Sequence, residues 1–66
     1  MHGHVANKVQ EFRSVARITQ EELAERVGVS RQTVIAIEKG NYTPSVMLAL
    51  KLARYFKRSV EDVFSL

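Results

Sequence analysis

The sequence predicts an all-α domain of five short helices, and two observations carry this prediction. Apolar residues recur at helical spacing along the chain, and no stretch alternates with the period of a strand. Four of the apolar stretches follow a residue that can cap a helix N-terminus, namely Thr19, Ser30, Ser45 and Ser59. A chain of 66 residues has room for one domain, which we expect at residues 7–66 after a flexible extension at residues 1–6.

The composition excludes several classes of protein. There is no cysteine, so disulfides and thiolate metal sites are excluded. No apolar run approaches the length of a membrane span and the first four residues do not resemble a signal peptide, so a cytoplasmic protein is expected. The formal net charge of +3 mildly favours binding to polyanions, although many proteins carry a charge of this size for solubility alone.

The first helix is expected to begin between Val5 and Asn7 and to end near Ala16. His2 and His4 precede it and could bind a metal weakly, but two ligands on a loose end make no defined site. We therefore predict no metal site. The inner face of this helix is predicted from apolar residues at i, i+4, i+7 and i+11, which are Val5, Val9, Phe12 and Ala16.

Residues 20–40 are expected to form two helices joined by a tight turn. Thr19 and Glu22 make a capping box for the first of them. Gly28 follows its last apolar position, where a left-handed residue closes a helix, and Ser30 can cap the next helix. This arrangement is typical of the helix-turn-helix unit that binds DNA. The residues expected to face inward are Leu23, Ala24, Val27, Val34 and Ile37.

A fourth helix is predicted from Val46 to Phe56, and Ser59 with Asp62 makes a capping box for a last turn. The apolar residues of the fourth helix form two stripes, an arc wide enough to cover two neighbours, or one neighbour and a partner chain. We expect one stripe and the C-terminal apolar residues to form a dimer interface; the alternative is that the last turn covers this stripe within one chain. The predicted interface residues are Leu48, Leu52, Tyr55, Phe64 and Leu66.

These segments together resemble the Cro and lambda-repressor-like helix-turn-helix family, the xenobiotic-response-element type of transcriptional regulator. The resemblance implies a lambda-repressor-like domain of five helices whose third helix lies in the major groove of DNA. The chain departs from the family at Arg17, where a glycine is common. Residues 7 to 66 are covered, and the matching motifs are Thr19–Ala24, Val27–Ser30, Val34 with Ile37–Gly40, and Pro44–Ser45.

The outward residues of the third helix are the predicted base contacts. Arg can donate two hydrogen bonds to guanine and Gln can pair similarly with adenine, so Arg31 and Gln32 in the opening turn are the leading base readers. The alternative is that both are ordinary solvated residues. Ile35 could contact a thymine methyl or be an ordinary exposed apolar residue, and Ala36 either permits close approach or simply fills the helix.

Contacts to the DNA backbone are expected from the helix starts and from the loop after the third helix. Gln20 lies at the start of a helix, where N–H groups can hold a phosphate. For Asn41, the geometry of the turn is a competing explanation. The full predicted set is Gln20, Ser30, Thr33, Lys39, Asn41, Tyr42 and Thr43.

Arg13 and Glu38 resemble a pair that family members use to tie the first helix to the end of the third. A partly buried pair of this kind would hold the reading helix in place. We therefore interpret Arg13 as structural first and as a DNA contact second.

The predicted function is a sequence-specific regulator of transcription that binds double-stranded DNA, with repression favoured over activation. Two-fold homodimers place two reading helices about 34 Å apart on a pseudo-palindromic operator. The sequence has no clustered catalytic set and no glycine-rich phosphate loop, so we expect no enzyme activity, no cofactor and no small-molecule ligand. Two alternatives stay open: an antitoxin-type module that binds a partner protein as well as DNA, and an architectural protein without sequence preference.

Overall fold

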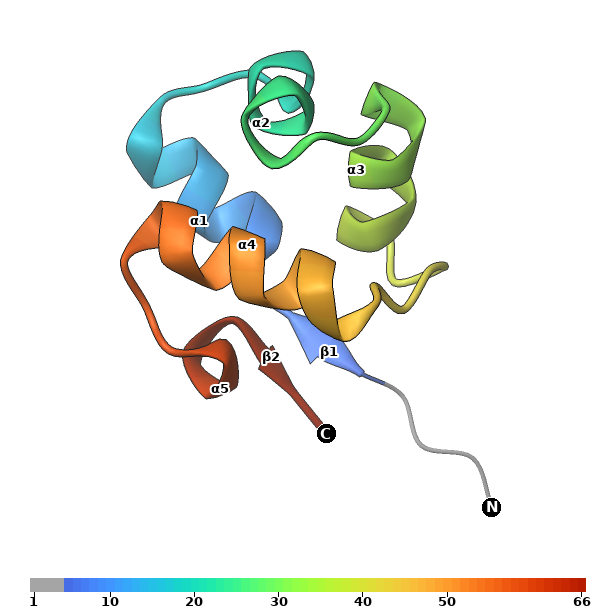
Figure 1. Cartoon of the computed structure of the whole chain (residues 1–66), viewed down its shortest axis with the longest axis vertical. Helices are drawn as coiled ribbons and strands as arrows, with labels where there is room; N and C mark the ends of the chain where they lie inside the picture. Colours follow the sequence, from blue (N-terminus) through green and yellow to red (C-terminus); the bar gives the residue numbers. More distant parts are fainter. Residues whose placement is uncertain (1–4) are drawn as a thin grey trace.

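Five helices and two short strands make up the fold, which a computed structural model describes for residues 5–66; His2 and His4 lie outside the described residues. Figure 1 shows the helix-turn-helix pair at the top and both strands at the bottom. The predicted all-α class is confirmed. In chain order the elements are β1 (Ala6–Asn7), α1 (Val9–Ala16), α2 (Gln20–Val27), α3 (Arg31–Glu38), α4 (Val46–Phe56), α5 (Val60–Val63) and β2 (Phe64–Ser65).

Hydrogen bonds between near neighbours set the starts of α2 to α5. In the capping box of α2, Thr19 Oγ1 accepts from the Glu22 N–H at 3.0 Å, and Glu22 Oε1 accepts from the Thr19 N–H at 2.8 Å. The bond from the Thr19 backbone, followed by that from its side chain, lowers the pKa of Glu22 below its ordinary value of 4.5. Ser45 and Ser59 cap α4 and α5 in the same manner. These caps were predicted from the sequence, and they are confirmed.

The core lies between the helices and is entirely apolar. The inward residues predicted for α2 and α3 all belong to it, so the orientation of the helix-turn-helix is as expected. No helix within residues 5–66 is long and apolar enough to cross a membrane. The buried core residues are Val9, Leu23, Ala24, Val27, Val34, Ile37, Leu48, Leu52, Ala53 and Val63.

The start of the first helix was predicted too early. Ala6 and Asn7 form a strand that pairs antiparallel with β2, Ala6 opposite Ser65 and Asn7 opposite Phe64. Strands of two residues are too short to show alternation, and their pairing joins opposite ends of the domain, so no local pattern reveals them. Ala6 therefore belongs to the folded domain and not to a flexible extension.

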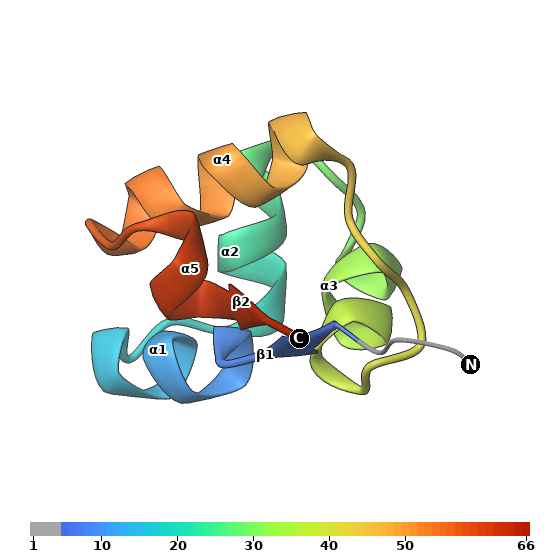
Figure 2. The ribbon, with the colours of Figure 1, turned by 90° about the horizontal axis from the view of Figure 1, so that it is seen from below.

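The orientation of α4 corrects the predicted dimer interface. Leu48 and Leu52 are only 7% and 1% exposed, because this stripe faces the core, with α5 packed against α4 (Figure 2). Tyr55 and Phe64 also pack, partly buried, against the core. Leu48 and Leu52 are therefore covered within one chain, which was the alternative considered from the sequence, whereas Tyr55 and Phe64 are covered only in part. Of the predicted set, only Leu66 is largely exposed, at 98%.

Candidate nucleic-acid interface

The start of α3 is closed by Ser30. Its Oγ accepts a hydrogen bond from the Thr33 N–H at 3.2 Å and lies 3.0 Å from Thr33 Oγ1. Such a cap satisfies N–H groups of the first turn that have no partner within the helix. Both hydroxyl groups therefore make hydrogen bonds within the protein, and only one of the two O–H groups, which were predicted to contact the DNA backbone, is left to donate elsewhere.

The orientation of α3 follows from its two buried residues. Val34 and Ile37 are each 1% exposed and face the core. Arg31 and Gln32 then lie on the opposite side of the first turn, where both are exposed. The structure therefore leaves the two predicted base readers accessible at the leading end of the helix.

Gly28 fixes α3 relative to α2. It has φ of 76°, a left-handed conformation that residues with a side chain rarely adopt, and it is followed by a hydrogen bond from the Val29 N–H to the Ala24 carbonyl of 2.9 Å. Two further residues lead directly to the first residue of α3. Because this connection is so short, α3 cannot turn independently of α2.

A polar network holds the other end of α3. Arg13 Nε donates to Glu38 Oε2 at 2.6 Å, and Arg13 Nη2 donates to Glu38 Oε1 at 3.3 Å. Gln20 Nε2 donates to the same Oε1 at 2.9 Å, and Arg13 Nη1 donates to the Ile18 carbonyl at 3.0 Å. The Arg13–Glu38 pair implied by the family resemblance is thus present, with side chains 16% and 4% exposed. It joins α1, α2 and α3 at one point.

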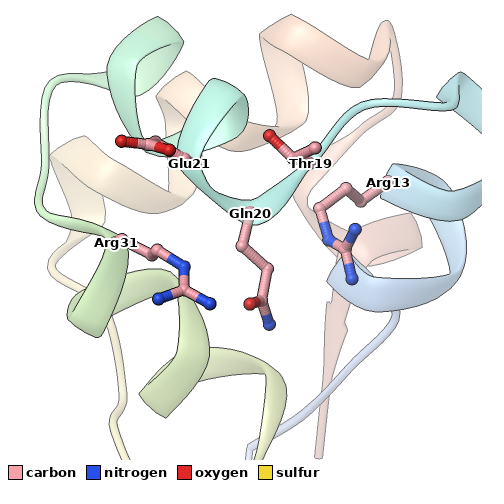
Figure 3. Close-up of a pocket in the computed structure, with 5 residues that line it drawn as sticks. All are labelled: Arg13, Thr19, Gln20, Glu21 and Arg31. Carbon is pink, nitrogen blue, oxygen red and sulfur yellow. The ribbon is translucent and has the colours of Figure 1, made fainter.

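A hollow of about 510 Å³ lies between the start of α2 and the start of α3. Figure 3 shows Gln20 extending into it between the side chains of Arg31 and Arg13. The Arg31 guanidinium beside the N-terminus of α2 favours an anion here, whereas Glu21 opposes one and the Arg13 guanidinium is already paired with Glu38. The lining residues are Arg13, Thr19, Gln20, Glu21 and Arg31.

The remaining predicted contacts divide into two groups. Ile35 and Ala36 are partly buried, so they are less outward than expected, and any contact they make with a base is limited to the exposed part of the side chain. The predicted contacts that follow the C-terminal end of α3 are all exposed; they are Lys39, Asn41, Tyr42 and Thr43.

Sequence reasoning missed the part that Asn7 plays. Its Oδ1 accepts from the Val9 N–H at 3.1 Å and its Nδ2 donates to the Ile37 carbonyl at 2.9 Å, so one side chain joins the start of α1 to the last turn of α3. The N-cap of α1 is Lys8, and the bond from the Val9 N–H to Asn7 makes an Asx turn, which asparagine commonly forms with backbone two residues further on. The bond to Ile37 has no local signal, because it spans 30 residues.

The arrangement defines a helix-turn-helix DNA-binding domain, in which a capped helix presents polar side chains while its inner face and C-terminal end are fixed. The family model described as Helix-turn-helix matches residues 16–63. The chain therefore belongs to the Cro/C1-type, or xenobiotic-response-element, family of helix-turn-helix transcriptional regulators.

Known proteins support this assignment. The chain is similar to the HTH-type transcriptional regulator MJ0272 of Methanocaldococcus jannaschii, with 53% identity over 58 residues that cover 88% of each chain. It is 57% identical over 58 residues to the HTH-type transcriptional regulator YgzD of Bacillus subtilis, again covering 88% of each chain. Among solved structures, the restriction-modification controller protein C.AhdI of Aeromonas hydrophila matches with a TM-score of 0.76 and 29% identity, over 83% of this chain and 80% of that one.

Proposed function

We propose that this helix-turn-helix regulator binds specific double-stranded DNA sequences by placing α3 in the major groove. The single observation that carries the proposal is the exposure of Arg31 and Gln32 on the first turn of a helix whose opposite face is buried. In this motif the opening turn of the second helix lies deepest in the groove. This geometry supports a role in binding DNA.

Base recognition rests on the hydrogen-bonding geometry of these two side chains. The Arg31 guanidinium can donate two parallel hydrogen bonds to guanine O6 and N7, and the Gln32 amide can pair with adenine N6 and N7. Each such contact discriminates against a wrong base by roughly 1–3 kcal/mol. Ile35 and Ala36 stand one turn further along α3, where their exposed parts can meet a thymine methyl.

Backbone contacts position the domain. A phosphate on one side would lie in the hollow beside Gln20, where the α2 N-terminus and Arg31 favour an anion. The exposed residues after α3, Lys39 and Asn41 to Thr43, can contact the backbone on the other side of the groove. Ser30 and Thr33 are assigned to the cap first, because their hydroxyl groups already bond each other.

We further propose a homodimer on a pseudo-palindromic operator. A single reading helix covers a short DNA segment, whereas two helices about 34 Å apart read two half-sites on one face of the duplex. Repression is the simplest outcome, because a bound dimer needs only to occupy the promoter, whereas activation requires an additional contact with the transcription machinery. The regulator would act on DNA in the cytoplasm.

Selection of bound sequences from a random duplex pool tests the proposal. Wild-type protein should enrich a pseudo-palindromic site, and Arg31→Ala and Gln32→Ala should each relax the preference at one base pair of each half-site. Arg54→Ala is the matched control, because it removes another exposed guanidinium from α4 and not from α3. Loss of affinity without a changed base preference would contradict the assignment of Arg31 and Gln32, and binding to random duplex within a few-fold of the best site would favour an architectural role.

A further inference from the structure

The C-terminal end of α3 closes in a turn made by two backbone hydrogen bonds. The Gly40 N–H donates to the Ile37 carbonyl and the Asn41 N–H donates to the Ala36 carbonyl, each at 2.9 Å. Gly40 has φ of 79°, the left-handed conformation that this kind of helix ending requires and that glycine adopts without strain. The loop that follows α3 therefore leaves the helix from a defined turn.

Beyond this turn the loop is held only at its far end. Within residues 5–66, no hydrogen bond reaches residues 42–44, and the next one belongs to Ser45, whose Oγ accepts from the Leu48 N–H at 3.1 Å. The position of the loop is therefore set by the turn at Gly40 and by the start of α4.

Asn7 ties the turn to the opposite end of the chain. Its Nδ2 donates to the Ile37 carbonyl at 2.9 Å, so that this carbonyl accepts two hydrogen bonds, one from Gly40 and one from a residue 30 positions away. A carbonyl oxygen has two lone pairs, and the bond from Gly40 already gives it a partner. The bond from Asn7 is thus not needed to satisfy the carbonyl, and its effect is to hold the turn in place.

Asn7 is itself fixed by its neighbours. Its backbone pairs with Phe64 of β2, and the Lys8 N–H donates to the Val63 carbonyl at 2.9 Å. Its Oδ1 accepts from the Val9 N–H at 3.1 Å, which leaves the amide group free to donate to α3. Figure 2 shows β1 beside the C-terminal end of α3. The strand and the start of α1 therefore hold the Asn7 side chain in the orientation that the bond to α3 requires.

We propose that Asn7 is a positioning residue for DNA binding, which acts through the turn at the end of α3. Its bond to the Ile37 carbonyl fixes this turn, and the fixed turn places Lys39 and residues 41–43 against the DNA backbone. The inference rests on the proposed function, which assigns backbone contacts to these residues. A loop that is not held in place has to be ordered when DNA binds, and this ordering costs binding free energy.

The base readers should not depend on Asn7. Arg31 and Gln32 lie at the other end of α3, where the short connection through Gly28 fixes the helix relative to α2. Loss of the Asn7 bond should therefore weaken the contacts to phosphate and leave the preferred base sequence unchanged. This combination of effects distinguishes positioning of the loop from base reading.

Amide hydrogen exchange of the full chain tests the link in the absence of DNA. Asn7→Ser keeps an oxygen that can accept from the Val9 N–H, but its side chain is too short to reach the Ile37 carbonyl. The Asn41 N–H should exchange roughly 5- to 10-fold faster in this variant, as expected for the loss of one hydrogen bond. The Val29 N–H, which closes α2 with a bond of the same length, should exchange at an unchanged rate. Equal acceleration at both amides, or at neither, would overturn the positioning role.

Two further variants separate the link from general stability. Asn7→Asp has nearly the native size and keeps the acceptor oxygen, but the ionised carboxylate cannot donate to α3, so exchange at Asn41 should again be faster. Ala53→Gly is the matched control, because it removes a buried methyl group two turns into α4 and leaves Asn7 unchanged. This control should melt at a lower temperature while the ratio of the Asn41 and Val29 exchange rates stays at the wild-type value.

The salt dependence of DNA binding tests the consequence of the link. Each phosphate contact adds about 0.9 to the slope of log affinity against log salt concentration. On the duplex that the wild-type protein selects, Lys39→Ala should lower this slope by about 1. Asn7→Ser should lower it by a similar amount and should weaken binding by roughly 3- to 10-fold. The double variant should lower the slope no further than Lys39→Ala alone, because both changes remove the same contact.

The outcomes distinguish this inference from the proposed function. A slope lowered by Lys39→Ala but by neither Asn7 variant would overturn the positioning role and leave the proposed function intact. Affinity lost equally at every salt concentration would show that Asn7 acts on stability alone, which also overturns the role. Slopes unchanged in every variant would contradict the proposed backbone contacts of the loop, and with them the role of Asn7. Wild-type protein without sequence-specific binding would contradict the proposed function, whereas faster exchange at Asn41 would still support the link.

Discussion

The inner and outer faces of α3 differ in what they contribute, although their residues alternate within one helix of eight residues. Val34 and Ile37 on the inner face are 1% exposed and contact the core. Arg31 and Gln32 on the outer face are exposed to solvent. The comparison indicates that stability and recognition can be changed separately in this domain, because the two sets of side chains have separate surroundings.

The largest expected effect is on stability, from the inner face. Ile37→Ala should lower the free energy of unfolding by roughly 2–5 kcal/mol, since a buried side chain is removed and a cavity remains. The matched control is Ile35→Ala, which deletes the same atoms from the same helix where the side chain is only partly buried. Chemical denaturation measures both. Equal losses from the two variants would show that the faces are not distinct.

The ion pair at the end of α3 should produce the next largest effect. Arg13→Ala removes the cation that pairs with the Glu38 carboxylate, so that Gln20 is its one remaining side-chain hydrogen-bond donor among the described residues. Because the Glu38 side chain is only 4% exposed, this change should destabilise the domain by about 3 kcal/mol. Arg13→Ala with Glu38→Ala should be less destabilising than the two single losses added, because the second change removes the unpaired charge. Additive losses in this double-mutant cycle would mean that the pair contributes little to holding α3.

Substitution of two glutamines, Gln20 and Gln32, should have a smaller effect, of about 1–3 kcal/mol in the free energy of DNA binding. Gln20→Ala and Gln32→Ala make the same chemical change at the first turns of α2 and α3. We expect Gln20→Ala to weaken binding to all sequences alike, because its amide lies in the anion-favouring hollow, and Gln32→Ala to change the preference at one base pair. Quantitative binding to operators with single substitutions distinguishes them. A change of base preference from Gln20→Ala would place base reading on α2 as well.

Local hydrogen bonds explain why much of the fold could be predicted from the sequence. The capping residues of α2 to α5 bond backbone three positions away, so their pattern is visible in the sequence itself, and the bounds of α4 follow from Ser45 and the apolar spacing after it. Arg17 illustrates a related point. It adopts φ of 61°, a conformation that glycine takes without strain, which accounts for the glycine common there in the family.

Contacts between distant residues explain what could not be predicted. The pairing of β1 with β2 and the bond from Gln20 to Glu38 join segments whose proximity exists only in the folded chain. The two apolar stripes of α4 are indistinguishable by spacing, and the packing of α5 against α4 decides that Leu48 and Leu52 are buried. For the candidate site, the sequence predicted the exposure of Arg31 and Gln32 correctly, whereas it did not predict that Gln20 is engaged by Glu38.

The smallest expected effect concerns the capping box of α2, which lies on neither face of α3. Hydrogen bonds from Thr19 lower the pKa of Glu22 in the folded state. A carboxyl with a lowered pKa contributes stability that is complete above its unfolded value, about 4.5, and is lost as the pH falls through the folded value. Glu22→Gln should therefore reduce stability at neutral pH by a small amount, and this difference should shrink in acid.

Glu25→Gln removes an equal charge from α2 without removing a capping bond, and controls for net charge. Unfolding followed across the acidic range measures the three proteins, and a deficit of Glu22→Gln that stays constant down to low pH would show that the box contributes through shape and not through charge.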